Sequence, residues 1–282
     1  MGPKYEFTDE TKFFMGHIIH RIRRLSDGKL GGWIEKEDNL SQEGSCWVDG
    51  EAVIVDNAQV YSDAQVYNNA FVADNAKVYD KADVSCDAVI AGNAQVYDEA
   101  RVSNDARVYG NAWVSDKAKI WGKAQIYNEA HVYNNAQVYG NAEVFEDAVI
   151  FGGAKVYDNA KVFGAKVYGS AQVSGDAQVY DNACIYDFAK ISDNAQVYNY
   201  AHIRDKAQVY CNAKVYNYSD VYHNAIVFGQ AEVADHAEVY NDAHISGNAK
   251  VFGNDTRVCG YANVRGSKIY SNIEISTGYY DK

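Results

Sequence analysis

A six-residue period governs this chain from Cys46 to the last repeat, which begins at Ile273. Each hexad has a small residue first, Val or Ile third, often Tyr fourth and two turn formers last, as in Ala58 to Asp63. There are 39 hexads, with Ala first in 34 of them and Val or Ile third in all 39. Because side chains alternate along a strand, the first and third positions share one face and the second and fourth share the other. The pattern therefore predicts four-residue strands that turn Ala and Val inward.

The last two positions of each hexad predict corners. They are mostly Asp, Asn, Gly, Glu or Lys, and Asp, Asn and Gly accept the left-handed backbone of a sharp corner. Every corner must return small and aliphatic residues to the same interior, so the chain must coil. Three flat faces give about 13 coils and a body about 60 Å long at a strand spacing of ~4.8 Å. We predict an all-β fold, a single-stranded, three-faced parallel β-helix.

The chain divides into three segments by this period. We predict an N-terminal β cap over residues 1–45, the parallel β-helix over 46–276 and a short tail over 277–282. In the cap, Tyr5 to Phe7 and His17 to Ile22 predict short strands broken by Gly16 and Gly28. The register slips by one residue three times, after Ala160, Ala249 and Ala262, and we expect one corner to absorb each slip.

Composition limits the partners and the compartment. The formal charge is -12, and the repeats carry 19 basic against 30 acidic side chains. An acidic body repels DNA and anionic membranes, so we expect no direct nucleic-acid binding and no membrane association. No apolar run suggests a secretory signal or a membrane span, and the five cysteines form no Cys-x-x-Cys pair. A cytoplasmic protein with reduced thiols is the expectation.

The hexad resembles the repeat of left-handed parallel β-helix proteins of the hexapeptide superfamily. This resemblance implies left-handed winding, although the usual crossover rule favours the right hand. The chain departs from that family because an aromatic residue follows the aliphatic one in 24 of 39 hexads. The segments Gly31 to Ile34 and Asn39 to Ser41, ahead of a Tyr-rich array, are similar to a group of phage- and bacterium-borne hexapeptide proteins. Those proteins are labelled only as transferases or polymer-forming proteins.

The superfamily resemblance also implies one enzymatic alternative. Its enzymes transfer acyl groups from an acyl-coenzyme A type donor, with a catalytic His near a subunit boundary and an extruded loop. The register slips here are too small for such a loop, and His131 and His202 stand about four coils, or ~19 Å, apart on one outward face. A general base needs an oriented partner and a pocket. We therefore assign no catalytic residue, and we predict no metal site and no cofactor, because no ligand spacing or phosphate-binding loop is present.

The tyrosines carry the sharper signal. Of 24 tyrosines, 18 occupy the outward fourth position, where residues three hexads apart stack in one column. The first predicted column contains Tyr109, Tyr127, Phe145, Phe163, Tyr180, Tyr198 and Tyr216. The second contains Tyr61, Tyr79, Tyr97, Ser115, Tyr133, Phe151, Tyr168, Tyr186, Arg204, Tyr222 and Tyr240. Serines dilute the third column. Stacked rings can stabilise the solenoid by about 0.5–1.5 kcal/mol per pair, but large aromatic faces are also typical of binding surfaces.

Three functional hypotheses follow. The first is a non-enzymatic scaffold or binding protein that self-associates as a dimer or trimer through the aromatic columns. If it is phage-borne, it would bind or sequester a host protein or a small molecule. The second is the acyltransferase. The third is acidic mimicry of nucleic acid, which lysines such as Lys77 and Lys119, interspersed with the acids, disfavour.

Overall fold

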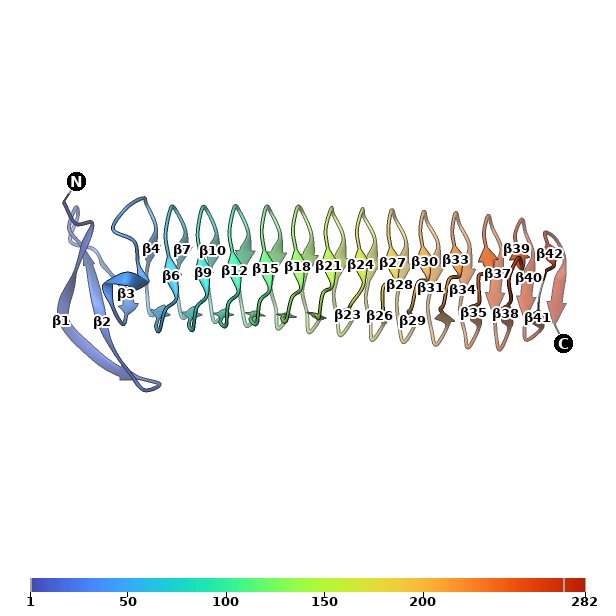
Figure 1. The fold of residues 1–282 in the computed structure, drawn as a ribbon, viewed down its shortest axis with the longest axis horizontal. Coiled ribbons are helices and arrows are strands. Elements are labelled where there is room, and N and C mark those ends of the chain that lie inside the picture. The colour runs from blue at the N-terminus through green and yellow to red at the C-terminus, as the bar shows by residue number, and fades with distance from the viewer. Residues whose placement is uncertain (1, 271, 282) are drawn as a thin grey trace. The chain divides into compact units, whose positions relative to one another are not determined.

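The computed structural model describes residues 2–270 and 272–281, and they divide into two compact units between Gly140 and Asn141. Both units are built as parallel β-solenoids with three sheets (Figure 1). We name the sheets A1, B1 and C1 in the first unit and A2, B2 and C2 in the second. The predicted fold class, an all-β parallel solenoid with three faces, is confirmed. The division into cap, repeat and tail stays a prediction.

The first unit begins with an antiparallel hairpin. Strands β1 (Tyr5–Phe14) and β2 (His17–Arg24) pair with each other, and β3 (Leu30–Ile34) pairs antiparallel with β2 and parallel with β5 (Val53–Ile54). A 3-10 helix, η1 (Glu37–Asn39), follows. The strands expected at Tyr5 to Phe7 and His17 to Ile22 are confirmed, and β1 runs on to Phe14. The hairpin thus lengthens sheet A1 ahead of the first coils (Figure 1).

The hairpin also covers part of the first coils. Ile19 of β2 is fully buried and forms a hydrophobic cluster with four other buried residues, Trp33, Val53, Val55 and Ala73. The partly buried rings of Phe14 and Phe71 pack against this cluster. Val55 and Ala73 hold fourth positions, where most hexads have an aromatic ring. These small side chains make room for the hairpin, because a stacked ring at either position would occupy the space that the hairpin fills.

The repeat strands of the first unit lie three apart along the chain within each sheet. Sheet A1 contains, besides the three strands of the cap, β5, β8 (Phe71–Val72), β11 (Val89–Ile90), β14 (Arg107–Val108) and β17 (Gln125–Ile126). Sheet B1 contains β6 (Gln59–Val60), β9 (Lys77–Val78), β12 (Gln95–Val96), β15 (Trp113–Val114) and β18 (His131–Val132). Sheet C1 contains β4 (Trp47–Val48), β7 (Gln65–Val66), β10 (Asp83–Val84), β13 (Arg101–Val102), β16 (Lys119–Ile120) and β19 (Gln137–Val138).

The second unit repeats the same arrangement. Sheet A2 contains β20 (Glu143–Phe145), β23 (Lys161–Phe163), β26 (Gln178–Tyr180), β29 (Gln196–Val197), β32 (Lys214–Val215), β35 (Glu232–Ala234), β38 (Lys250–Phe252) and β41 (Lys268–Tyr270). Sheet B2 contains β21 (Val149–Ile150), β24 (Lys166–Val167), β27 (Cys184–Ile185), β30 (His202–Ile203), β33 (Asp220–Val221), β36 (Glu238–Val239), β39 (Arg257–Val258) and β42 (Glu274–Ile275). Sheet C2 contains β22 (Lys155–Val156), β25 (Gln172–Val173), β28 (Lys190–Ile191), β31 (Gln208–Val209), β34 (Ile226–Val227), β37 (His244–Ser246), β40 (Asn263–Arg265) and β43 (Tyr279–Asp281).

The three register slips lie in the second unit, and one corner absorbs each of them. After the five-residue step beyond Ala160, Lys166 still pairs with Val149, its expected partner one coil earlier. After the other two slips, Arg257 pairs with Glu238 and Lys268 pairs with Lys250. The strand order is therefore preserved through every slip, as expected.

Backbone hydrogen bonds explain the hexad. The second, fourth and sixth residues donate to the first, third and fifth carbonyls of the next coil, as Gln59 does to Ala76 at 2.9 Å and Tyr61 does to Val78 at 3.1 Å. At many corners the first residue donates back to the fourth carbonyl, as in the 3.2 Å bond from Ala58 N to Val55 O. The predicted four-residue strands are therefore too long, because the first and fourth residues also close the corner. Regular pairing covers the second and third positions and reaches the fourth in strands such as β20.

The fifth position has a second function in the corners. It takes the left-handed backbone, as predicted, with φ of 59° at Asp74 and 56° at Asp116. In addition, the Asp74 carboxylate accepts a 2.8 Å hydrogen bond from Gly92 N, and Asp116 accepts one of 3.0 Å from Asn134 N, each one coil further on. The backbone ladder leaves this N–H without a carbonyl, so an Asp at the fifth position caps the next corner.

Candidate binding faces

The longest aromatic column of the second unit lies on sheet A2. We call it ladder A2, and it consists of Phe145, Phe163, Tyr180, Tyr198 and Tyr216. Successive ring centroids are 4.8 to 4.9 Å apart, and neighbouring rings lie within 11° of parallel. The ring spacing equals the strand spacing because each ring comes from the fourth position of successive coils. The stacking predicted for these residues is confirmed.

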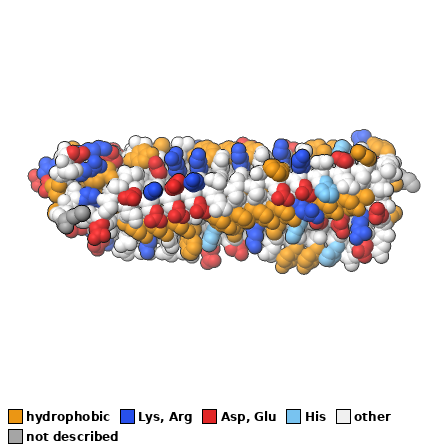
Figure 2. Space-filling view, turned by 90° about the horizontal axis from the view of Figure 1, so that it is seen from above, with side chains coloured by type: hydrophobic (Ala, Val, Ile, Leu, Met, Phe, Trp, Pro, Cys, Tyr) orange, Lys and Arg blue, Asp and Glu red, His pale blue; other side chains and the backbone are white. Residues whose placement is uncertain are grey.

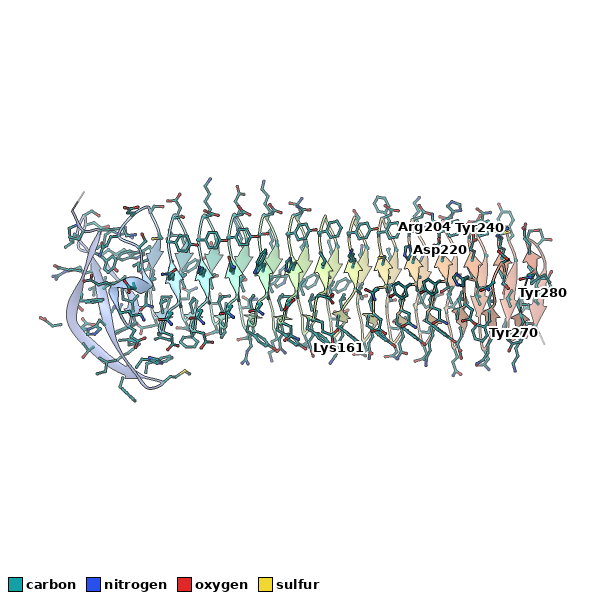
Figure 3. The ribbon with its side chains drawn as sticks, viewed as in Figure 1. Lys161, Arg204, Asp220, Tyr240, Tyr270 and Tyr280 are labelled. Carbon is teal, nitrogen blue, oxygen red and sulfur yellow. The ribbon has the colours of Figure 1, made fainter. Side chains whose placement is uncertain are left out.

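Ladder B2, on sheet B2, includes a cation. Its members are Phe151, Tyr168, Tyr186, Arg204, Tyr222 and Tyr240. The Arg204 guanidinium lies 3.9 Å from the centroid of the Tyr222 ring. It also donates to both carboxylate oxygens of Asp220, at 3.3 and 2.9 Å, and these two residues lie side by side in Figure 3. A planar guanidinium can stack like a ring while it binds a carboxylate with two hydrogen bonds. Arg204 therefore serves as a rung of the ladder.

The first unit has shorter stacks. On sheet B1 the rings of Tyr61, Tyr79 and Tyr97 stack at 4.9 and 5.0 Å, and on sheet A1 Tyr109 stacks on Tyr127 at 4.9 Å. Tyr133 also occupies a fourth position on this unit, after β18, and is half-buried. Within each unit, therefore, the predicted columns form stacks, and their use as binding faces stays a prediction.

The ladder rings are half-buried, in contrast to a fully exposed aromatic surface. Neighbouring rings cover both faces of an inner ring such as Tyr198, so its edge is the part left to solvent. Many hydroxyl groups reach the second position of the next coil: Tyr79 donates to Gln95 at 3.1 Å, and Tyr222 donates to Glu238 at 3.0 Å. Burial is the main reason that the pKa of Tyr79 is raised to about 12, and that the pKa of Tyr216 is also raised to about 12.

One aromatic stack lies at a corner and was missed by the sequence analysis. Tyr200, Tyr218 and His236 stack at 4.9 and 4.7 Å, and the two tyrosines are 49% and 55% exposed. They hold sixth positions, for which the hexad pattern predicts only turn formers. The repeated Asn-Tyr pairs at 199–200 and 217–218 were the available signal.

On the surface seen in Figure 2, hydrophobic side chains gather in rows with charged and His side chains between them.

The histidines considered for catalysis have aromatic neighbours. His131 stacks on Trp113 at 4.8 Å, and His202 meets the Tyr186 ring edge-on at 6.2 Å. These contacts assign both imidazoles to the packing of the outward faces. The structure places no carboxylate in ion-pair contact with either ring within its described residues, so neither shows the oriented partner of a general base.

A cluster near the hairpin brings together three side chains that could hold a metal ion. His17, Glu35 and Asp56 offer ligand atoms within 4.8 Å of one another. His17 Nδ1 lies 3.1 Å from Glu35 Oε1, His17 Nε2 lies 3.8 Å from Asp56 Oδ1, and Glu35 Oε2 accepts a 2.6 Å bond from Asp56 N. These contacts pair the three groups with one another, so we assign them to anchoring the hairpin. No spacing in the sequence predicts this cluster, because only the hairpin brings His17 next to Glu35 and Asp56.

The hydrogen bond to Glu35 is the main reason that the pKa of His17 is raised. Burial works to raise the pKa of Glu35, but the hydrogen bonds from His17 and from Asp56 N together lower it.

None of the helices in the described part of the chain is long and apolar enough to span a bilayer.

The fold and these faces define a parallel β-solenoid with aromatic ladders. A family model described as the YdcK beta solenoid repeat matches residues 100–116, which lie in the first unit. This segment of the chain is therefore similar to a known solenoid repeat. No curated protein matches the chain.

Proposed function

We propose that this protein is a non-enzymatic binding scaffold that self-associates through ladder A2. The observation that carries the proposal is the unbroken stack of five aromatic rings on one sheet. Tyr and Phe are enriched at protein interfaces, and contiguous aromatic surface is typical of binding sites. Ladder B2 is less suited to this use, because Arg204 and Asp220 interrupt it with charge.

A second copy is the partner that best matches this surface. The exposed parts of ladder A2 are ring edges that repeat every 4.8 to 4.9 Å. A second ladder has the same period, so the ring edges of one copy can pack between those of the other along the whole stack. An unrelated protein would need the same repeat to match more than one or two rings. A closed dimer or trimer is the expected assembly.

The resemblance to phage- and bacterium-borne hexapeptide proteins adds a second element to the proposal. In that setting, the faces outside the self-association surface would bind or sequester a host protein or a small molecule. The proposed location is the cytoplasm, where the buried thiols of Cys46 and Cys259 would stay reduced. The acyltransferase alternative has no support from His131 and His202, which contact aromatic rings. The acidic-mimic alternative has no support from corner carboxylates such as Asp74 and Asp116, which accept hydrogen bonds from the backbone.

Light scattering tests the self-association. The solution mass of the wild type is compared with that of a variant carrying Tyr180→Ser, Tyr198→Ser and Tyr216→Ser. The matched control changes three ladder B2 residues of the same unit, Tyr168→Ser, Tyr186→Ser and Tyr222→Ser. We expect a wild-type dimer or trimer, a monomeric ladder A2 variant and an unchanged control, all with solenoid circular dichroism. A monomeric wild type would refute the proposal, and equal loss of assembly in both variants would refute the assignment to ladder A2.

A further inference from the structure

The aromatic column of sheet A1 stops where a hollow begins. Tyr127 stacks on Tyr109 with an interplanar angle of 1°. On the other side of Tyr109, the register partner one coil earlier is Ala91, because Val89 pairs with Arg107 and Ile90 pairs with Val108. A hollow of about 390 Å³ lies here, lined by Asp74, Val89, Ala91, Arg107, Tyr109 and Gln125, with Gly92 and Gly110 at the corner. The column therefore lacks one rung at Ala91.

Other alanines in these columns leave no such space. Ala73 is buried under the hairpin. Ala234 of the second unit is fully buried, and the rings of Tyr216 and Phe252 meet edge to face at 6.3 Å in the same column. Ala91, in contrast, is half-buried and lines the hollow. The short Ala91 side chain therefore leaves the space beside the Tyr109 ring open.

The hollow has the chemistry of a small ligand site. It is an open surface hollow, and its volume lies near the lower end of the range of about 300–1,000 Å³ for small-ligand sites. The methyl groups of Val89 and Ala91 form an apolar floor, and the Tyr109 ring forms a wall. Arg107 is exposed at the second position beside Tyr109, and its guanidinium can donate two parallel hydrogen bonds to a carboxylate. The Asp74 carboxylate already accepts the 2.8 Å hydrogen bond from Gly92 N.

We propose that this hollow binds a planar aromatic ring carrying a carboxylate. The ring stacks on Tyr109 at the place of the missing rung, about one coil spacing away, and the carboxylate binds Arg107. Gln125 is held in position by the 3.2 Å hydrogen bond that it accepts from the Tyr109 hydroxyl, and this bond fixes the ring that forms the wall. The site shares no residue with ladder A2, because all of its residues belong to the first unit.

Nuclear magnetic resonance titration of the full chain tests the site with three probes that share one ring. They are 4-hydroxyphenylacetate, the neutral 4-ethylphenol and the cationic tyramine. We expect 4-hydroxyphenylacetate to bind most tightly, with saturable upfield shifts of its ring protons from stacking on tyrosine. No saturable shift, or tightest binding of tyramine, would overturn the proposal, because the second result would make Asp74 the dominant charge.

Variants locate the binding. Arg107→Gln should weaken 4-hydroxyphenylacetate about tenfold and remove its advantage over 4-ethylphenol, as expected for loss of a charge-assisted hydrogen bond. Ala91→Tyr should supply the missing rung and abolish binding, and Ala91→Leu fills the same space if the Tyr variant does not fold. Ser103→Tyr, which adds a ring at a fourth position on sheet C1 of the same unit, is the matched control and should bind normally. Equal loss in Ser103→Tyr, or unchanged binding in both Ala91 variants, would refute the location.

Discussion

Tyr198 offers a direct measure of what a ladder contributes to stability. Its ring lies 4.8 Å from Tyr180 and 4.9 Å from Tyr216, with interplanar angles of 4° and 1°. Each aromatic pair stabilises a fold by about 0.5–1.5 kcal/mol beyond area burial. Tyr198→Ala loses two pairs, so it should lower the free energy of unfolding by about 1–3 kcal/mol from stacking alone.

A double-mutant cycle isolates one of these pairs. The variants Tyr180→Ala and Tyr198→Ala and their combination would be unfolded in urea and followed by circular dichroism. We expect the double variant to lose about 0.5–1.5 kcal/mol less than the sum of the single losses, because the pair can be broken only once. Comparison of the unfolding slopes shows whether each variant unfolds as a single transition, as the cycle requires.

A second cycle serves as the control. Tyr168 belongs to ladder B2 on another sheet of the same unit, so Tyr168→Ala and Tyr198→Ala should be additive within about 0.3–0.5 kcal/mol. Additivity of Tyr180 and Tyr198 within that same margin would refute the view that stacking stabilises the solenoid. The ring spacing would then follow from the coil spacing alone, and the ladder would contribute to binding and not to stability.

Three further predictions concern the corner, the hairpin and the tyrosines. Asp74→Ala should cost more than about 1 kcal/mol of unfolding free energy, because Gly92 N loses its acceptor and Ala at this left-handed position adds backbone strain, whereas Asp74→Asn should retain most of the stability in the same urea assay. The His17–Glu35 pair should stabilise the hairpin most between about pH 4.5 and 6.5. Because the pKa of His17 is raised, the stabilisation from its positive charge is lost as the pH rises above 6.5 and the imidazole loses its proton. Because the pKa of Glu35 is lowered, the stabilisation from its negative charge is lost as the pH falls below 4.5 and the carboxylate gains a proton. Trp fluorescence during urea unfolding should show this maximum in the wild type and its loss in His17→Gln. The raised pKa of Tyr79, about 12, predicts less phenolate absorbance at pH 11 in the native protein than in urea, and native stability that falls as pH rises above 10. Equal absorbance in the two states would contradict it.

Much of the candidate site could be predicted because it repeats. Val144 and Val162 are fully buried at the third position, and Phe145 and Phe163 stack at the fourth, for the same reason: pairing in register places equivalent residues above one another. The five-residue step before Ala165 did not disturb this register, since Phe151 still stacks on Tyr168 at 4.8 Å. Exposure was less predictable. The ladder rings proved half-buried, because each ring hides the faces of its neighbours, whereas the corner residues Tyr200 and Tyr218 are more exposed than the ladder rings.

The sequence by itself determined the coil, the inward Ala and Val and the aromatic columns, because a six-residue period is a local property that every coil repeats. Only the tertiary structure decided the features that break the period. The hairpin brings His17 to Glu35 and Asp56 and buries Ala73, whereas Ala91, one coil further on, lines the hollow beside Tyr109. These contacts join residues far apart in the chain through antiparallel pairing and side-chain packing. No repeat unit encodes them, and their outcome depends on which volumes meet in the folded protein.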